Sequence, residues 1–208
     1  MIDAKSRYSA RILTLAAIGA LASTTGCHID THKENGNENV KIATPFGGLS
    51  VKTNDAVVQE GVGLSMYPGA TLIRKDKDKD NGAADVNMSF GSFHLGVKAL
   101  SYHTDDPADK VTDFYRKDMS HFGAVILCHD HHAVGTPART QDGLACEDDN
   151  SHHPQIHIDQ DSKNELKAGS KQHQHIVSIE PEGTGTKIGL IALDLPGNFG
   201  KDDDDAKQ

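Results

Sequence analysis

The sequence predicts an α+β domain in which a mostly antiparallel sheet of short strands packs against one main amphipathic helix. Two observations favour this fold class. Apolar and polar residues alternate over several short segments, which is typical of strands with one buried face. Residues 107–122 instead place their apolar side chains three or four positions apart, which is the period of a helix.

The helix has recognisable ends. Asp106 is a typical N-cap, Pro107 suits the first helical position, and Gly123 is a typical terminator. The apolar stripe between them is expected to face the core. It consists of Val111, Phe114, Tyr115, Met119 and Phe122.

Residues 86–104 have the strongest strand pattern. Phe93, Leu95, Val97 and Ala99 alternate with their neighbours, and the phase then shifts by one residue towards Leu100 and Tyr102. We therefore expect a β-bulge near Ala99, because one extra residue in a strand reverses the faces. Two further strands are expected at 174–180 and 187–195, joined by a glycine-rich turn.

The first 26 residues have the features of an export signal. Lys5, Arg7 and Arg11 precede an apolar run at 12–22, and small residues follow. This run is too short to span a bilayer core, which needs about 20 residues. No other stretch is long and apolar enough, so we expect no transmembrane helix.

Thr24-Thr25-Gly26-Cys27 resembles the lipobox of bacterial lipoproteins, although Leu is usual where Thr24 stands. The resemblance implies cleavage after Gly26 and diacylation of Cys27, which would anchor the protein in a membrane. Ordinary secretion with cleavage after Ala22 is the alternative. His28 follows Cys27 in place of the Asp that resembles an inner-membrane retention signal. We therefore expect the outer membrane, with the domain facing the periplasm.

The expected organisation is a signal peptide at 1–26, a polar tether at 27–44, one α+β domain at 45–197 and a charged disordered tail at 198–208. The chain carries a formal net charge of −9. Because a protein this acidic repels phosphate backbones, nucleic acid is not an expected partner. The expected partners are the membrane, through the lipid, and possible envelope proteins.

Two cysteines remain after Cys27. Cys128 and Cys146 are an even pair in an oxidising compartment, which favours a disulfide closing a loop of 18 residues. Two free thiols are one alternative. A metal-binding pair is another, because histidines follow Cys128 at positions 129, 131 and 132.

Two segments carry a resemblance to a known group. They are Tyr67-Pro68-Gly69-Ala70 and residues 102–106, which run into Val111, Phe114 and Tyr115. The combination resembles a broad group of uncharacterised exported bacterial proteins in which a YPGA turn precedes a strand and a V-x-x-F-Y helix. The cysteine pair and residues 165–175 resemble a narrower lipoprotein subset of that group. The resemblance covers roughly residues 60–195 and implies a compact periplasmic domain, with no activity or site residue attached.

Thirteen histidines offer candidate metal ligands. His173 and His175 are two apart, so on a strand they share a face, as do His157 and Asp159. Imidazole nitrogens suit Zn and Cu, and three or four converging ligands make a site. The alternative is a set of exposed polar histidines without a shared ligand.

The sequence favours a lipid-anchored envelope protein that acts as a non-enzymatic binding or structural module. No catalytic motif such as G-x-S-x-G or a P-loop is present, so no catalytic residue is assigned. The first alternative is a histidine-rich lipoprotein that binds a transition metal. The second is a hydrolase that uses metal or histidine.

Overall fold

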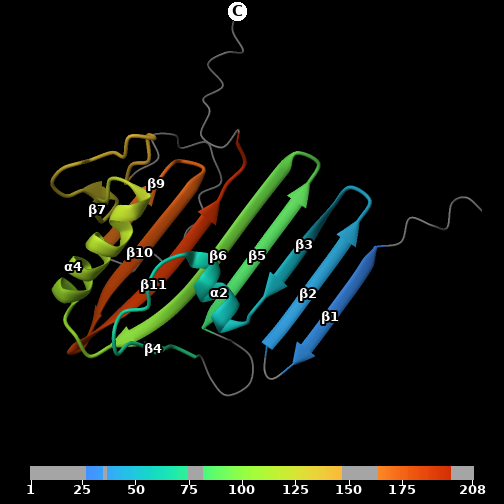
Figure 1. Cartoon of the computed structure of the whole chain (residues 1–208), viewed down its shortest axis with the longest axis horizontal. Helices are drawn as coiled ribbons and strands as arrows, with labels where there is room; N and C mark the ends of the chain where they lie inside the picture. Colours follow the sequence, from blue (N-terminus) through green and yellow to red (C-terminus); the bar gives the residue numbers. More distant parts are fainter. Residues whose placement is uncertain (1–26, 35–36, 75–81, 147–163, 198–208) are drawn as a thin grey trace, which may run out of the picture.

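The computed structural model describes residues 27–34, 37–74, 82–146 and 164–197. Within these residues the dominant feature is one antiparallel sheet of eleven strands (Figure 1). Its order is β1-β2-β3-β5-β6-β11-β10-β9-β7-β8, and β4 pairs with β6 beside this path. The segments expected to be a signal peptide, 1–26, and a charged tail, 198–208, lie outside the described residues. The fold agrees with a mostly antiparallel α+β architecture, although the sheet is larger than expected.

The strands of one half of the sheet are β1 (His28–Glu34), β2 (Asn37–Thr44), β3 (Gly47–Lys52), β4 (Thr71–Leu72), β5 (Ala83–Phe90) and β6 (Phe93–Thr104). The strands of the other half are β7 (Ile126–His129), β8 (His132–Ala133), β9 (Asn164–Gly169), β10 (His173–Glu182) and β11 (Gly185–Asp194). The helices are α2 (Asp55–Val62), α4 (Ala108–Asp118) and the 3-10 turn η1 (Met119–Phe122).

Both α-helices pack on the same face of the central strands. Side chains of α2, α4 and η1 join apolar residues of β6, β9, β10 and β11 in one buried core. Among its fully buried members are Val58, Val111, Tyr115, Leu166 and Leu190. Neither helix lies over β1, β2 or β3, which extend beyond the helical layer as a three-stranded wing (Figure 1).

The opposite, helix-free face carries continuous apolar rows. Residues that pair directly across antiparallel strands share a face. The first row is Ile29, Ile42, Leu49, Met88 and Leu95. The second row is Val40, Val51, Val86, Val97 and Leu193. The sheet is therefore amphipathic from its centre to its β1 edge.

The segment that we expected to be a polar tether, 27–44, forms β1 and β2. Every residue of β1 pairs with β2, from His28 opposite Ala43 to Glu34 opposite Asn37. Residues 35–36 between them are Asn-Gly, the pair that most favours a two-residue hairpin. The low apolar content of 28–44 hid this hairpin, because only one of its faces needs apolar side chains.

Helix α2 was not predicted, and its end signals explain why it forms. Asn54 caps it by accepting a hydrogen bond from the backbone N–H of Val57 at 3.1 Å. Gly63 ends it in the left-handed region, with φ of 71°. Val58 and Val62, four residues apart, are its buried side chains. The helix is too short for its periodicity to stand out in the sequence.

The expected bulge near Ala99 is absent, since β6 pairs without interruption with both β5 and β11. Leu95, Val97 and Ala99 face the helix-free side, whereas Leu100 and Tyr102 face the helices. Along β6 the apolar residues therefore move from the helix-free face to the helix-covered face. The backbone pairing stays regular throughout. The expected strand 86–104 is a hairpin of β5 and β6 that turns at Gly91 and Ser92.

The predicted helix 107–122 is present as α4 followed by η1. Its N-cap is Pro107, which makes no side-chain capping bond, rather than Asp106. The Asp106 carboxylate instead accepts hydrogen bonds from the Tyr67 hydroxyl at 2.8 Å and from Lys110 Nζ at 3.0 Å. These two bonds lower the pKa of Asp106.

The YPGA turn and the V-x-x-F-Y helix, which carry the resemblance noted in the sequence, meet in the core. The Tyr67 ring lies 5.1 Å from the Phe114 ring in an edge-on arrangement and 6.4 Å from the Tyr115 ring. Burial is the main cause that raises the pKa of Tyr67, and the bond to Asp106 adds to it. Tyr67 therefore fastens its turn to the start of α4.

The two faces of β6 should differ in their contribution to stability. Leu100 is 1% exposed under the helices, whereas Leu95 is partly exposed on the opposite face. We expect Leu100→Ala to lower the free energy of unfolding by about 2–5 kcal/mol and Leu95→Ala by clearly less. Urea unfolding of both variants measures the difference. Equal losses would show that the helix-free face is buried as completely as the core.

Candidate functional site

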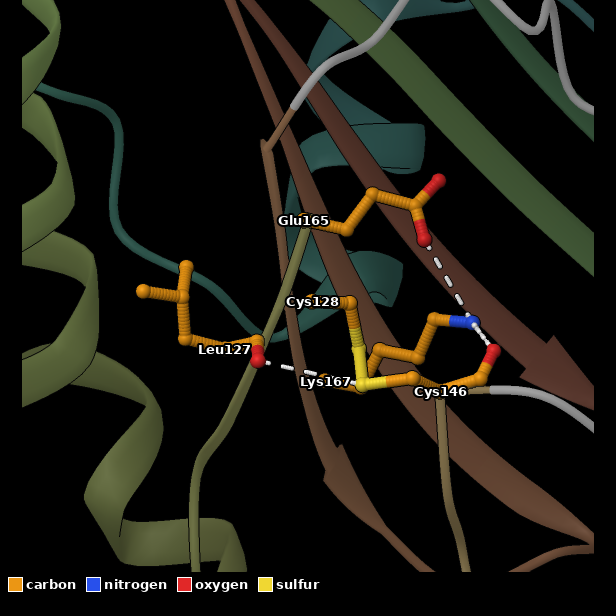
Figure 2. Close-up of a disulfide and its surroundings, with 5 residues drawn as sticks. All are labelled: Leu127, Cys128, Cys146, Glu165 and Lys167. Carbon is orange, nitrogen blue, oxygen red and sulfur yellow. Dashed lines mark hydrogen bonds and ion pairs between the residues drawn. A yellow bond between two sulfur atoms is a disulfide. The ribbon is translucent and has the colours of Figure 1, made fainter. Parts of the chain in front are cut away.

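A disulfide joins Cys128 on β7 to Cys146, as the sequence predicted (Figure 2). Their Cα atoms are 5.5 Å apart, and both residues are buried. Ile126 and Leu144 pack with them in a small separate core. The bond ties the segment after β8 back onto the β7–β9 edge of the sheet.

Polar groups around the disulfide are paired. Lys167 Nζ donates to the carbonyl oxygen of Cys146 at 3.2 Å and lies 3.4 Å from Glu165 Oε2 (Figure 2). The Cys146 sulfur is 3.8 Å from the carbonyl oxygen of Leu127. Because a disulfide sulfur carries no hydrogen, this last approach is a contact without donation. These interactions hold the crosslinked segment against β9 and make the disulfide a structural feature.

His173 and His175 lie on one face of β10, as their spacing predicted, but they have different neighbours. His173 Nδ1 lies 2.8 Å from Asp194 Oδ1 on β11, its direct cross-strand partner. The other oxygen of Asp194 is 3.6 Å from His94 Nε2 on β6. All three side chains are largely exposed at this end of the sheet.

The His175 ring stacks on the Phe122 ring, with centroids 3.5 Å apart and planes 12° from parallel. The His121 ring is also close to Phe122, with ring centroids 3.8 Å apart and the planes tilted by 42°. The Nδ1 atom of His175 is buried and has no hydrogen-bond partner among the described residues. His175 therefore packs as an aromatic side chain between η1 and the end of α2.

Burial lowers the pKa of His175, because the charged ring loses its hydration. The neighbouring His121 and His173 lower it further by repulsion, while a backbone hydrogen bond at Val62 acts in the opposite direction. The neutral form is thus favoured in the folded protein.

The four predicted metal ligands are only partly described. His157 and Asp159 lie outside the described residues, and His173 and His175 make the separate contacts given above. In the described ranges, no group of three or more His, Cys, Asp or Glu side chains is placed to hold a metal ion. The four-ligand metal site stays a prediction, because two of its members lie outside the described residues.

A second candidate site lies at the end of the sheet where β1 begins (Figure 1). Cys27 is exposed and immediately precedes β1. The turns between β2 and β3 and between β5 and β6 lie at this same end, because His28 pairs with Ala43 and Gly47 pairs with Phe90. We call Cys27, the first residues of β1, the β2–β3 turn and the β5–β6 turn together the β1 end.

Three phenylalanines are exposed at the β1 end. Phe46 is 83% exposed in the β2–β3 turn, and Phe90 and Phe93, which pair directly, are 49% and 40% exposed. Ile29 on β1 is 65% exposed. The sequence reasoning missed this cluster, although one signal was available: residues 42–51 and 86–97 contain no Asp, Glu, Lys or Arg in a chain that is 25% charged.

No protein-family model matches the chain, and comparisons with curated proteins and with solved structures find no significant match. The candidate sites are therefore interpreted from their geometry alone.

The disulfide should contribute substantially to stability. Closing an 18-residue loop restricts the unfolded chain, so the Cys128→Ala/Cys146→Ala variant should lose roughly 3 kcal/mol of unfolding free energy. Urea unfolding measures this loss. Wild type treated with a reductant is the matched control and should unfold near the midpoint of the variant. A variant as stable as the oxidised wild type would contradict a stabilising crosslink.

The half-buried His175 should make the protein less stable in mild acid. Its folded pKa lies below the unfolded value near 6.5, so the unfolded chain binds the proton first as pH falls. Stability is therefore complete above about pH 6.5 and decreases as pH falls from there through the lower folded pKa. Thermal unfolding of wild type between pH 7.5 and 5 should show this loss.

Two variants distinguish the effect of His175 protonation on stability from the effect of its packing against Phe122. His175→Phe keeps an aromatic ring in the stack and should flatten the decrease in melting temperature below pH 6.5. Phe122→Leu retains the imidazole, so it should be less stable at every pH with the wild-type pH dependence preserved. A His175→Phe profile parallel to that of wild type would assign the acid sensitivity to other groups.

Proposed function

We propose that the chain is a lipid-anchored envelope protein whose α+β domain is a non-enzymatic binding or structural module. The observation that carries this proposal is the position of Cys27. It directly follows a signal-like segment and directly precedes β1, whose seven residues all pair with β2. Lipid on this thiol would attach the sheet itself to the membrane without a spacer.

One further observation supports an envelope location. The Cys128–Cys146 disulfide suits an oxidising compartment outside the cytoplasm. The described helices include none that is long and apolar enough to cross a bilayer. A covalent lipid would supply stable attachment, because two acyl chains bind a membrane far more firmly than one.

The polar groups of the core support a binding or structural role over a catalytic one. The Tyr102 hydroxyl donates to Gln59 Oε1, and Gln59 Nε2 donates to the carbonyl oxygen of Leu64 at 2.6 Å. Tyr67 and Asp106 likewise connect a turn to a helix. Each of these bonds fastens one element to another, which is the behaviour of a rigid scaffold.

The anchor is tested by removing the thiol. Wild type should sediment with the membrane, and Cys27→Ala should appear in the soluble envelope fraction because it cannot be acylated. The Cys128→Ala/Cys146→Ala variant is the control for general loss of cysteine and should remain membrane-bound. A Cys27→Ala protein that still sediments with membranes would refute the lipoprotein assignment.

The choice of membrane is tested on the same wild-type fractions. Because His28 follows Cys27, density separation of the two membranes should place the protein in the outer membrane. Recovery in the inner membrane would refute this location while leaving the lipid anchor intact.

A further inference from the structure

We propose that the β1 end is a membrane-insertion surface, in which Phe46, Phe90 and Phe93 enter the interfacial layer of the bilayer that holds the Cys27 lipid. This inference rests on the proposed lipid anchor. It adds a second contact with the membrane, made by side chains of the folded domain, and it therefore fixes which end of the sheet faces the lipid.

Exposed apolar side chains cluster at the β1 end. Large exposed apolar patches on soluble proteins mark sites of contact with proteins, ligands or membranes. Phe46, Phe90 and Phe93 project from two neighbouring turns, and the Phe46 carbonyl oxygen accepts a hydrogen bond from the Gly91 N–H at 3.2 Å. The two turns are thus held side by side and present their rings as one patch.

The exposed phenylalanines lie close to the Cys27 anchor. Neighbouring strands lie about 4.8 Å apart, so three steps from β1 to β5 place Phe90 roughly 15 Å from the Cys27 strand. Phe46 is closer, because its turn follows β2. Acyl chains on Cys27 would therefore hold these rings at the same membrane surface. Ile29, two residues after Cys27, begins the first apolar row.

Acidic and basic side chains on these strands lie away from the exposed phenylalanines. In β2, β3, β5 and β6 the first ionised side chains inward from the turns are Lys41, Lys52, Asp85 and Lys98. Asp85 is five residues from Phe90, which at about 3.4 Å per residue is roughly 17 Å along the strand. Interfacial side chains enter only about 5–10 Å, so these charges would stay in water. On the β11 side, Asp194 with His94 and His173 bounds the patch.

Backbone polar groups of the β2–β3 turn are paired within the turn. Unpaired N–H and C=O groups are strongly disfavoured in an apolar medium. The Thr44 hydroxyl donates to the Gly47 carbonyl at 2.8 Å, and its oxygen accepts from the N–H groups of Phe46 and Gly47 at 3.3 and 3.1 Å. The turn therefore satisfies its own backbone while its ring points outward.

The chain contains no tryptophan, so a single introduced indole reports its own environment. The experiment uses the full processed and acylated protein, reconstituted into phosphatidylcholine vesicles with or without brominated acyl chains. Phe46→Trp and Phe93→Trp place the reporter in the patch. Val57→Trp is the matched control, because Val57 is 47% exposed on α2, away from the β1 end.

We expect the indole at 46 or 93 to fluoresce at shorter wavelength on reconstitution and to be quenched by brominated lipid several-fold more than the indole at 57. Equal, weak quenching at all three positions in protein that floats with the vesicles would overturn the insertion surface and leave the anchor standing. A blue shift at 46 without quenching would overturn it, because the indole would then be buried against a second copy of the chain and not in lipid. Protein that lacks acyl mass and does not float would overturn the proposed anchor, and this inference with it.

Discussion

The packing of α2 and α4 on a single face of β6, β11 and β10 is the constraint on which the rest of the molecule depends. It places Leu100, Tyr102 and Leu190 in the main core and leaves the other face of the same strands to a separate apolar cluster. Because the helices stop short of β3, the hairpin of β1 and β2 is held, within the described part of the chain, by its neighbouring strand alone. Phe90 and Phe93 lie on the face opposite the helices, as Leu95 and Val97 do, so the helical layer does not cover the candidate membrane surface.

Much of the central fold could be predicted from the sequence because local signals and tertiary packing agree there. The spacing of the apolar residues from Val111 to Phe122 indicates a helix by itself. The same apolar side packs on the face of the sheet that the helix covers. The two strands on either side of the glycine-rich turn expected at 181–186 were equally clear, although β10 continues to Glu182 and β11 begins at Gly185. Where a short element depends on its neighbours, prediction failed: α2 is two turns long, and β1 has Ile29 as its one large apolar residue.

The bulge that we expected in β6 shows a different limit. A one-residue change of phase has two physical origins, an inserted residue or a change in the face that is buried, and the sequence of one strand does not distinguish them. Pairing with β5 and β11 decides in favour of the second. The candidate sites show the same limit, since the spacing of His173 and His175 predicted a shared face but not the Phe122 ring that separates their environments.

The direct junction between Cys27 and β1 has a consequence for reach. A lipoprotein with a long flexible leader can extend towards other layers of the envelope, whereas acyl chains on Cys27 would keep this domain against its own bilayer. β6, with twelve residues at about 3.3 Å each, then sets the height of the domain at roughly 40 Å. A partner would have to come within that height of the membrane, and it would meet first the far end of the sheet, where Tyr67 and Asp106 join the turn to the helix.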